Sequence, residues 1–459
     1  MSENNALLWA PRAWVAGRWQ EAVLLRVGAD GHWAEIGIGV VAPPEASVLP
    51  GPALPGMVDA HSHAFQRAFA GLAERRTGEH DDFWSWRDRM YDVALRITPT
   101  QLRAVAAQLY AELLHGGYTQ VSEFHYLQHA PDGQPFVDPL ELSWALADAA
   151  SDTGIGLTVL PALYERAGFG EPALRRDQRR FATSAEGVLA LHRGLRDSHR
   201  PWLTAGVAIH SLRAATPEAI ARLVAPLGDV PIHIHVAEQT GEVADCLTAT
   251  GQRPIEWLTR HAALDARWQL VHATQSTPTE IDSVARTGAG VVLCPTTEAN
   301  LGDGLADLPR WLAAGVPLSI GSDSQVTRSW CDELRTVEYG QRLHLKQRNV
   351  AASPDQGESA TAARLLERAL CGGGVAAGFK RWGLVPGARA DLLVLDTSDS
   401  SLLGAPPSHL LDSLVFSTPG RPFRDVMVGG RWALRDHRHP NAAEIARRFV
   451  EAMRVLWPG

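Results

Sequence analysis

Histidine and carboxylate side chains, the usual ligands of a catalytic metal, follow short apolar runs at several places in the chain. The clearest run is Pro231–Glu238 (PIHIHVAE), in which β-branched residues alternate with histidines before His235 and Glu238. This pattern predicts a buried strand whose carboxyl end bears an imidazole and then a carboxylate. Four other apolar runs end in comparable groups, namely His61 with His63, His210, His272 and Asp323. Such groups at the ends of successive strands predict an active site at the mouth of a (β/α)8 barrel.

The H-x-H motif is the centre of a predicted metal site. Side chains two residues apart share a face of a strand, so His61 and His63 can hold one cation, although an isolated H-x-H also occurs in turns without metal. The matching strand ends favour the metal interpretation, with His235 as a third ligand and Asp323 as a fourth. Three imidazoles and one carboxylate favour Zn²⁺, with Fe²⁺, Mn²⁺ or Co²⁺ as substitutes. Asp323 could instead cap a helix after the strand exit.

A single metal ion is favoured over a pair. A dinuclear site of this architecture usually needs a bridging ligand, such as a modified lysine on a middle strand. The chain contains only two lysines, Lys346 and Lys380, and neither falls on a predicted barrel strand. We therefore expect one divalent metal per chain.

Strand-like and helix-like segments alternate through the middle of the chain, which predicts a parallel sheet. The strand candidates reach the barrel number of eight: residues 57–61, 118–124, 155–162, 203–210, 231–236, 268–273, 289–294 and 317–321. Helices are predicted between most of them, including Pro99–His115, Thr216–Pro226 and Thr277–Arg286. The long aromatic insertion 64–98 is typical of a lid over a barrel mouth, although a hydrophobic cluster on the barrel flank explains its aromatic residues more simply.

The two ends of the chain have a different pattern from the middle. Short strand candidates punctuated by glycine occupy residues 7–55, and the same pattern returns after residue 383. We infer that the ends pair into one small β-sandwich domain, interrupted by the barrel. The predicted organisation is a first β-domain part (1–55), the barrel (56–382), a second β-domain part (383–440) and an amphipathic C-terminal helix (441–459).

Length, charge and cysteine usage restrict the function classes. A chain of 459 residues exceeds the usual size of one compact domain. The formal net charge of −8 argues against a general nucleic-acid or anionic-membrane partner. The four cysteines lack C-x-x-C spacing, and neither a signal-like N-terminus nor a membrane-spanning run is found. We expect a cytoplasmic protein with no nucleic-acid or membrane partner.

Taken together, these features resemble the amidohydrolase superfamily in its mononuclear deaminase branch. Within it, four segments are similar to the family of formimidoylglutamate deiminases: HSHAFQRAFAGLAE (61–74), FWSWR (83–87), EFHY (123–126) and HSLR (210–213). The resemblance covers nearly the whole chain. It implies metal-dependent hydrolysis of N-formimidoyl-L-glutamate to N-formyl-L-glutamate and ammonia, a step of histidine degradation. One position departs from the family pattern, since Gln325 stands where a histidine is expected after the G-S-D-S run.

The resemblance also implies roles for individual residues. The implied catalytic groups are Glu238 as proton shuttle, His272 as hydrogen-bond donor to the attacking oxygen, and Asp323 as ligand and proton acceptor. A bound divalent metal lowers the pKa of its water from about 16 towards about 7, and a protonated leaving nitrogen departs more easily. The implied metal ligands are His61, His63, His235 and Asp323. The implied substrate contacts are Gln66, Arg87, Tyr126, His210, Arg213 and His272.

The two arginines suit a substrate with two carboxylates, because a guanidinium binds a carboxylate through two parallel hydrogen bonds. Both arginines also have simpler interpretations. Arg87 could form a surface ion pair with Asp88 or Glu79, and Arg213 could pair with Glu218 at a helix start. Ordinary packing or a turn position could likewise explain the other candidates, Gln66, Tyr126 and His210.

Two alternative functions would use part of the same pattern. Another mononuclear deaminase, acting on a purine, a pyrimidine or an S-adenosyl compound, would keep the metal site and replace the arginines by a cradle for a flat ring. A non-catalytic metal-binding protein would have no use for Glu238 and His272. We therefore predict an enzyme for a small dianionic substrate, formimidoylglutamate. We also expect the enzyme to be a homodimer.

Overall fold

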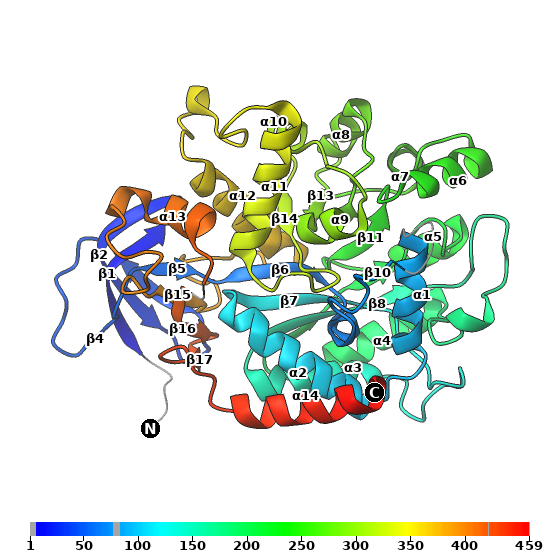
Figure 1. Ribbon diagram of the computed structural model, residues 1–459, viewed down its shortest axis with the longest axis horizontal. Coiled ribbons are helices and arrows are strands. Elements are labelled where there is room, and N and C mark those ends of the chain that lie inside the picture. The colour runs from blue at the N-terminus through cyan, green and yellow to red at the C-terminus, as the bar shows by residue number, and fades with distance from the viewer. Residues whose placement is uncertain (1–5, 77–82, 421, 459) are drawn as a thin grey trace.

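The computed structural model describes residues 6–76, 83–420 and 422–458, which form a barrel with a separate sheet beside it (Figure 1). The barrel strands are parallel and follow one another in chain order around the ring. Their bounds are β6 (Met57–Ser62), β7 (Tyr118–His125), β8 (Gly156–Leu163), β10 (Val207–Ile209), β11 (Ile232–Val236), β12 (Trp268–His272), β13 (Gly290–Leu293) and β14 (Leu318–Ile320). The predicted eight-stranded barrel is confirmed.

One predicted strand is divided. Instead of a single strand over 203–210, a short β9 (Leu203–Ala205) and β10 are separated by Gly206. A side chain at Gly206 would meet the carbonyl oxygen of Pro231 at 2.5 Å. The chain therefore changes direction at a point where only glycine fits against the neighbouring strand.

The ring closes at the ends of its first and last strands. β6 and β14 meet through an isolated bridge between Ser62 and Asp323. The Asp323 amide donates to the carbonyl of His61 at 2.9 Å, and the His63 amide donates to the carbonyl of Asp323 at 3.3 Å. Gly321 permits this approach, because a Cβ there would lie 2.7 Å from His61. Closure of the barrel thus brings three of the predicted metal ligands together.

Helices surround the barrel, and several begin with the same local signal. Thr98, Thr216 and Thr277 each cap a helix with a side-chain oxygen, and a proline follows each in the first turn. The helices from the insertion to the last strand are α1 (Phe83–Ala94), α2 (Pro99–His115), α3 (Glu141–Thr153), α4 (Ala185–Asp197), α5 (Pro217–Val224), α6 (Thr240–Thr250), α7 (Pro254–His261), α8 (Pro278–Ala285), α9 (Pro295–Leu301) and α10 (Leu308–Ala313). After β14 come α11 (Trp330–Leu345), α12 (Thr361–Ala376), α13 (Leu410–Ser417) and α14 (Ala442–Leu456). Short 3-10 turns occupy Ala64–Ala68, Arg176–Gln178, Pro354–Gln356 and Pro407–His409.

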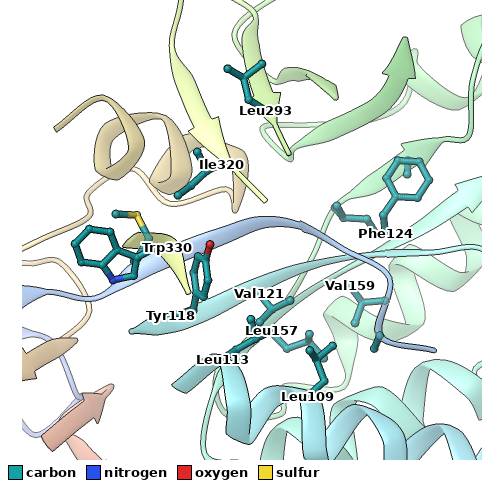
Figure 2. Packing of buried hydrophobic residues seen from close by; sticks show 14 of the residues in the cluster. Leu109, Leu113, Tyr118, Val121, Phe124, Leu157, Val159, Leu293, Ile320 and Trp330 are labelled. Carbon is teal, nitrogen blue, oxygen red and sulfur yellow. The ribbon is translucent and has the colours of Figure 1, made fainter. Parts of the chain in front are cut away.

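The main core fills the space between the barrel and its helices. Figure 2 shows Leu109 and Leu113 of α2 beside Val121 of β7 and Leu157 of β8, all at most 1% exposed. Full burial of such aliphatic side chains contributes about 1.5–3 kcal/mol each. This packing holds β7 and β8 rigid, and the site lies at their carboxyl ends.

The two chain ends form one hydrogen-bonded sheet, as predicted from their shared strand pattern. Its strand order is β17-β16-β15-β5-β1-β2-β3, with β4 paired to β1, and β5 pairs antiparallel with β15. The strands are β1 (Leu7–Val15), β2 (Arg18–Val27), β3 (Trp33–Gly37), β4 (Ser47–Val48), β5 (Ala53–Pro55), β15 (Leu392–Leu395), β16 (Phe423–Val428) and β17 (Arg431–Leu434). The passage from this sheet to the barrel falls at Gly56.

The C-terminal helix returns to the barrel. In Figure 1, α14 (red) runs beside α2, and the Trp457 indole donates to the carbonyl of Ala68 at 2.8 Å. The 3-10 turn that follows His63 is therefore anchored by the end of the chain. Across residues 6–76, 83–420 and 422–458, we find no helix with the length and apolarity to cross a membrane.

Candidate active site

The four predicted metal ligands converge at the barrel mouth. The Nε2 atoms of His61 and His235 are 3.0 Å apart. Asp323 Oδ1 lies 3.3 Å from His61 Nε2 and 3.4 Å from His63 Nε2. These atoms come from β6, the residue after it, β11 and the residues after β14. The cluster therefore depends on the whole ring rather than on one local segment.

Two of the histidines are oriented by backbone carbonyls. The Nδ1–H of His63 donates to the carbonyl of Phe124 at 2.8 Å, and that of His235 donates to the carbonyl of His210 at 2.9 Å. Each hydrogen bond fixes the tautomer and leaves the Nε2 lone pair directed into the cluster, which is the arrangement of metal-binding histidines. The Phe124 ring packs 4.3 Å from the His235 ring and 5.2 Å from the His61 ring, centroid to centroid.

The protonation states also suit a cation. Burial lowers the pKa of His61 to about 4 and that of His63 to about 3, and it lowers the pKa of His235 well below its usual value. Burial alone would raise the pKa of Asp323, but the hydrogen bond from His61 and the nearby imidazoles hold it below its usual range. At neutral pH the group thus offers three neutral imidazoles and one carboxylate, a donor set that fits Zn²⁺.

Buried polar groups hold the ligand-bearing segments in place. Asp59 accepts hydrogen bonds from the amide and the hydroxyl of Ser322 at 2.9 and 2.6 Å. Glu123 accepts from the amide of Ala64 at 2.6 Å. Gln325, the departure from the family pattern, donates to the hydroxyl of Ser62 at 3.1 Å and to the carbonyl of Asp323 at 2.8 Å. These contacts tie the end of β6 to the end of β14 beneath the cluster.

We expect about one tightly bound divalent metal per chain, because His61, His63, His235 and Asp323 converge here on one point. Lys346 caps α11 and Lys380 follows α12, so no lysine of the chain lies on a barrel strand to bridge a second ion. Elemental analysis of the purified protein gives the ratio directly. Two tightly held metals per chain in the active protein would contradict this expectation.

Glu238, His272 and Glu298 form a second group beside the ligands. His272 Nε2 lies 3.7 Å from Glu238 Oε1 and 3.9 Å from Asp323 Oδ2, while its Nδ1 lies 3.4 Å from Glu298 Oε1. Burial disfavours the imidazolium, but the three carboxylates outweigh it and raise the pKa of His272 to about 10. Burial raises the pKa of Glu238 to about 7. The group can therefore donate from His272 and move a proton at Glu238 near neutral pH.

A cavity opens from this cluster and receives every residue that the sequence predicted to contact substrate. Its wall includes the ligands His63, His235 and Asp323 together with Glu238. The predicted contacts on the same wall are Gln66, Arg87, Tyr126, His210, Arg213 and His272. Gln66 Nε2 donates to the Tyr126 hydroxyl at 3.2 Å, so these two side chains are held together on one side of the cavity.

The arginines bring positive charge to the cavity wall. Arg87 lies over the Tyr91 ring, with Cζ 5.5 Å from its centroid. Burial lowers the pKa of the Arg87 guanidinium, and the charges of Arg175 and Arg213 add to this effect. Among the described residues, no carboxylate forms an ion pair with Arg213, so the predicted alternative pairing with Glu218 is not observed. Glu79, an alternative partner of Arg87, lies outside the described residues.

Several residues of the site were missed by sequence reasoning. Tyr91 and Tyr164 line it, and the Tyr164 ring packs 4.4 Å from the His210 ring. Glu298, which orients His272, lies on α9 and not at a strand end. The only sequence signal for Glu298 is its position four residues after Cys294, where a helix start lets its side chain accept from the Cys294 amide at 2.9 Å.

Comparison with known proteins gives an independent view of the chain. A formimidoylglutamate deiminase from Pseudomonas aeruginosa is 46% identical over 98% of this chain and 99% of its own length. A 5-methylthioadenosine/S-adenosylhomocysteine deaminase from Natronomonas pharaonis is 29% identical over 83% of this chain and 81% of its own. The crystal structure of an amidohydrolase from Brucella melitensis superposes with a TM-score of 0.93 at 42% identity, covering 98% of this chain and 99% of that one.

The family assignment follows from the extent of these matches. The model of the amidohydrolase family matches residues 53–433, which include the whole barrel and the strands β5, β15 and β16 of the end sheet. The site described above lies entirely within the matched range. This chain is a member of the amidohydrolase family.

Proposed function

We propose that the protein hydrolyses N-formimidoyl-L-glutamate to N-formyl-L-glutamate and ammonia. The observation that supports this most strongly is the charge distribution along one cavity wall. Arg87 and Arg213 line the same cavity as Glu238 and the ligand cluster. The charges of the substrate are complementary to these groups. Its two carboxylates suit the two arginines, and its amidine, which is protonated at neutral pH, suits Glu238.

The reaction requires addition of water to the formimidoyl carbon and departure of its terminal nitrogen. His61, His63, His235 and Asp323 would hold the metal, which supplies a nucleophilic water at neutral pH when bound. Asp323 accepts one proton from the attacking water. Glu238 delivers a proton to the terminal nitrogen, so that the C–N bond breaks with ammonia rather than an amide anion as the leaving group.

His272 acts on the oxygen that adds to carbon. Its Nδ1 faces Glu298 at 3.4 Å, so its Nε2–H is directed into the space between Glu238 and Asp323. An imidazolium held there stabilises the negative charge that develops on this oxygen in the transition state. The surrounding carboxylates keep the ring charged, which strengthens this hydrogen bond.

Further features belong to the same proposal. Zn²⁺ is the proposed metal, since its preference for imidazole and carboxylate matches the donor set. We place the enzyme in histidine degradation, in the cytoplasm and as a homodimer. All four cysteines are free thiols, three of them buried, which agrees with a reducing compartment.

A deaminase for purine, pyrimidine or S-adenosyl substrates is the weaker alternative. It draws support only from relatives such as the 29% identical deaminase. A flat, uncharged ring offers no carboxylate to Arg213, which forms no ion pair among the described residues, and a guanidinium left without a carboxylate partner in a partly buried pocket costs free energy.

An ammonia-release assay on the zinc-loaded protein tests the proposal. N-formimidoyl-L-glutamate, 5-methylthioadenosine, S-adenosylhomocysteine and cytosine are compared at equal concentration. We expect turnover of the formimidoyl compound only. Preferred turnover of a heterocycle would refute the proposed substrate.

The arginines are expected to divide the binding of the two carboxylates. Loss of one charge-assisted bidentate pair costs about 1.5–3 kcal/mol, so Arg87→Met and Arg213→Met should each lower kcat/KM by ~10- to 100-fold. Metal content should not change, because neither side chain is a proposed ligand. Steady-state kinetics and elemental analysis of both variants provide the measurement.

An analogue with one carboxylate makes this test sharper. On a formimidoyl derivative of a monocarboxylic amino acid, one of the two arginines has no carboxylate to bind. The variant that lacks this arginine should have the same kcat/KM as the wild type on that analogue. The other variant should still show a lower kcat/KM than the wild type. Equal losses by both variants on every substrate would mean that the arginines support the fold. Arg76→Met offers a matched control, because it removes an arginine outside the cavity wall.

A further inference from the structure

The connection after α9 brings a buried carboxyl group against the loop that bears Glu238. Gly302 ends α9 in the left-handed conformation, and Gly304 has φ of 114°, a value that other residues rarely adopt. Between them, the Asp303 amide donates to the carbonyl of Glu298 at 2.9 Å. The turn directs the Asp303 side chain inward, where the residue is only 6% exposed.

Two glutamine amides join Asp303 to the Glu238 loop. Gln239, the neighbour of Glu238, donates from Nε2 to Asp303 Oδ1. Gln275, from the loop after β12, donates from Nε2 to the carbonyl of Asp303 at 2.5 Å and to the carbonyl of Glu238 at 3.2 Å. The loops after β11 and β12 are therefore cross-linked to the connection after α9, next to Glu238.

Glu238 needs such support because its own loop is in an unfavourable conformation. Ala237 has φ of 52°, in the left-handed region that costs a residue with a Cβ. From one side, the Glu242 carboxylate accepts from the amides of Ala237 and Glu238 at 3.1 and 3.0 Å. The Gln275 bond to the Glu238 carbonyl restrains the loop from the other side.

We propose that Asp303 is a positioning residue for Glu238: its carboxylate accepts from Gln239, while its backbone carbonyl accepts from Gln275, and the carboxylate bond fixes the loop so that the Glu238 side chain stays beside His272. This inference rests on the proposed function. Asp303 is not among the residues that line the cavity, whereas its partner Gln239 is. Its contribution is expected in kcat and not in substrate affinity, because the arginines hold the substrate independently of this loop.

Two substitutions of Asp303 distinguish a requirement for its hydrogen-bond acceptor from a requirement for its negative charge. Asp303→Ala removes the acceptor of Gln239 and should lower kcat by up to ~100-fold, the scale of a displaced catalytic group, while KM changes by less than about threefold. Asp303→Asn keeps an oxygen at Oδ1 and should restore kcat to within about threefold of the wild type. Equal loss of kcat in both variants would overturn the positioning role, because the carboxyl charge would then be the requirement.

A double-mutant cycle keeps the test independent of folding defects in one variant. If Asp303 acts through Gln239, then Asp303→Ala should add little to the loss already caused by Gln239→Ala. Fully additive losses would contradict the proposal. The matched control is Gln341→Ala, which removes a buried 2.8 Å hydrogen bond to the carbonyl of Ala306 in the same connection without touching residues 238 or 239.

The control distinguishes general loosening of the connection from displacement of Glu238. Gln341→Ala should lower the thermal midpoint but leave kcat unchanged, and a kcat loss equal to that of Asp303→Ala would overturn the proposal. All variants are compared with the wild type by ammonia release from N-formimidoyl-L-glutamate. A wild type without turnover would refute the proposed function, whereas an active wild type matched by Asp303→Ala would refute only the positioning role.

Discussion

Glu238→Gln is expected to lower kcat for N-formimidoyl-L-glutamate by ~100- to 10,000-fold, the range for a positioned acid–base group. The amide is nearly isosteric but cannot deliver a proton, so the terminal nitrogen would have to leave as an amide anion. Metal content and KM should stay close to the wild type, since Glu238 is neither a proposed ligand nor a partner of the substrate carboxylates. Stopped assays of ammonia release together with elemental analysis measure all three quantities.

A neighbouring carboxylate provides the control for this variant. Asp245 is exposed on α6 at the edge of the same cavity, and Asp245→Asn removes a negative charge without removing a buried proton donor. It should retain nearly full activity. If Glu238→Gln also retained it, Glu238 would have no part in the chemistry.

Asp323→Ala and His235→Ala are expected to abolish activity together with metal binding. Each removes one of four converging ligand atoms, so metal affinity should fall by more than the ~10- to 100-fold typical of losing a residue that only supports a ligand. The melting temperature of both variants should change less than it does when a core residue is truncated, because these side chains lie at the barrel mouth and not in the apolar core. Metal titration and turnover of the same preparations give the result.

His233 offers a matched control on the same strand. Its imidazole is fully buried on β11, but it bonds to the carbonyl of Ala376 at 2.8 Å, away from the cluster. His233→Ala should lose stability while keeping its metal. Full metal occupancy and rate in His235→Ala would remove His235 from the ligand set.

The barrel was predictable from sequence because its signals are local. Apolar runs bounded by proline or glycine define most of the strands, and Pro99–His115 coincides with α2 because a Thr-Pro cap marks its start. The split of the predicted 203–210 strand was not predictable, since it results from the backbone of Pro231 approaching Gly206. The continuation of β1 through Pro11 was not predictable either. Pro11 lies opposite Ala22 of β2, which has a left-handed backbone conformation, and the pairing of the two strands is interrupted there.

Some residues of the site could likewise be predicted from the sequence, and others could not. Strand ends are recognisable in a sequence, so His61, His235 and Asp323 could be grouped before their separation was known. Glu298 and Asp303 could not, because one lies within a helix and the other in a glycine-bounded turn. Their relation to His272 and Glu238 arises from contacts between separate loops, which no periodic pattern encodes.

The proposed reaction breaks the bond between the formimidoyl carbon and its terminal nitrogen, and the products show whether this is the bond that breaks. Zinc-loaded protein is incubated with N-formimidoyl-L-glutamate in ¹⁸O-labelled water, and the products are identified by mass spectrometry with ammonia measured in parallel. We expect N-formyl-L-glutamate with the label in its formyl oxygen and one equivalent of ammonia, because Glu238 is proposed to protonate the terminal nitrogen. Release of L-glutamate and formamide, or the absence of any turnover, would contradict it.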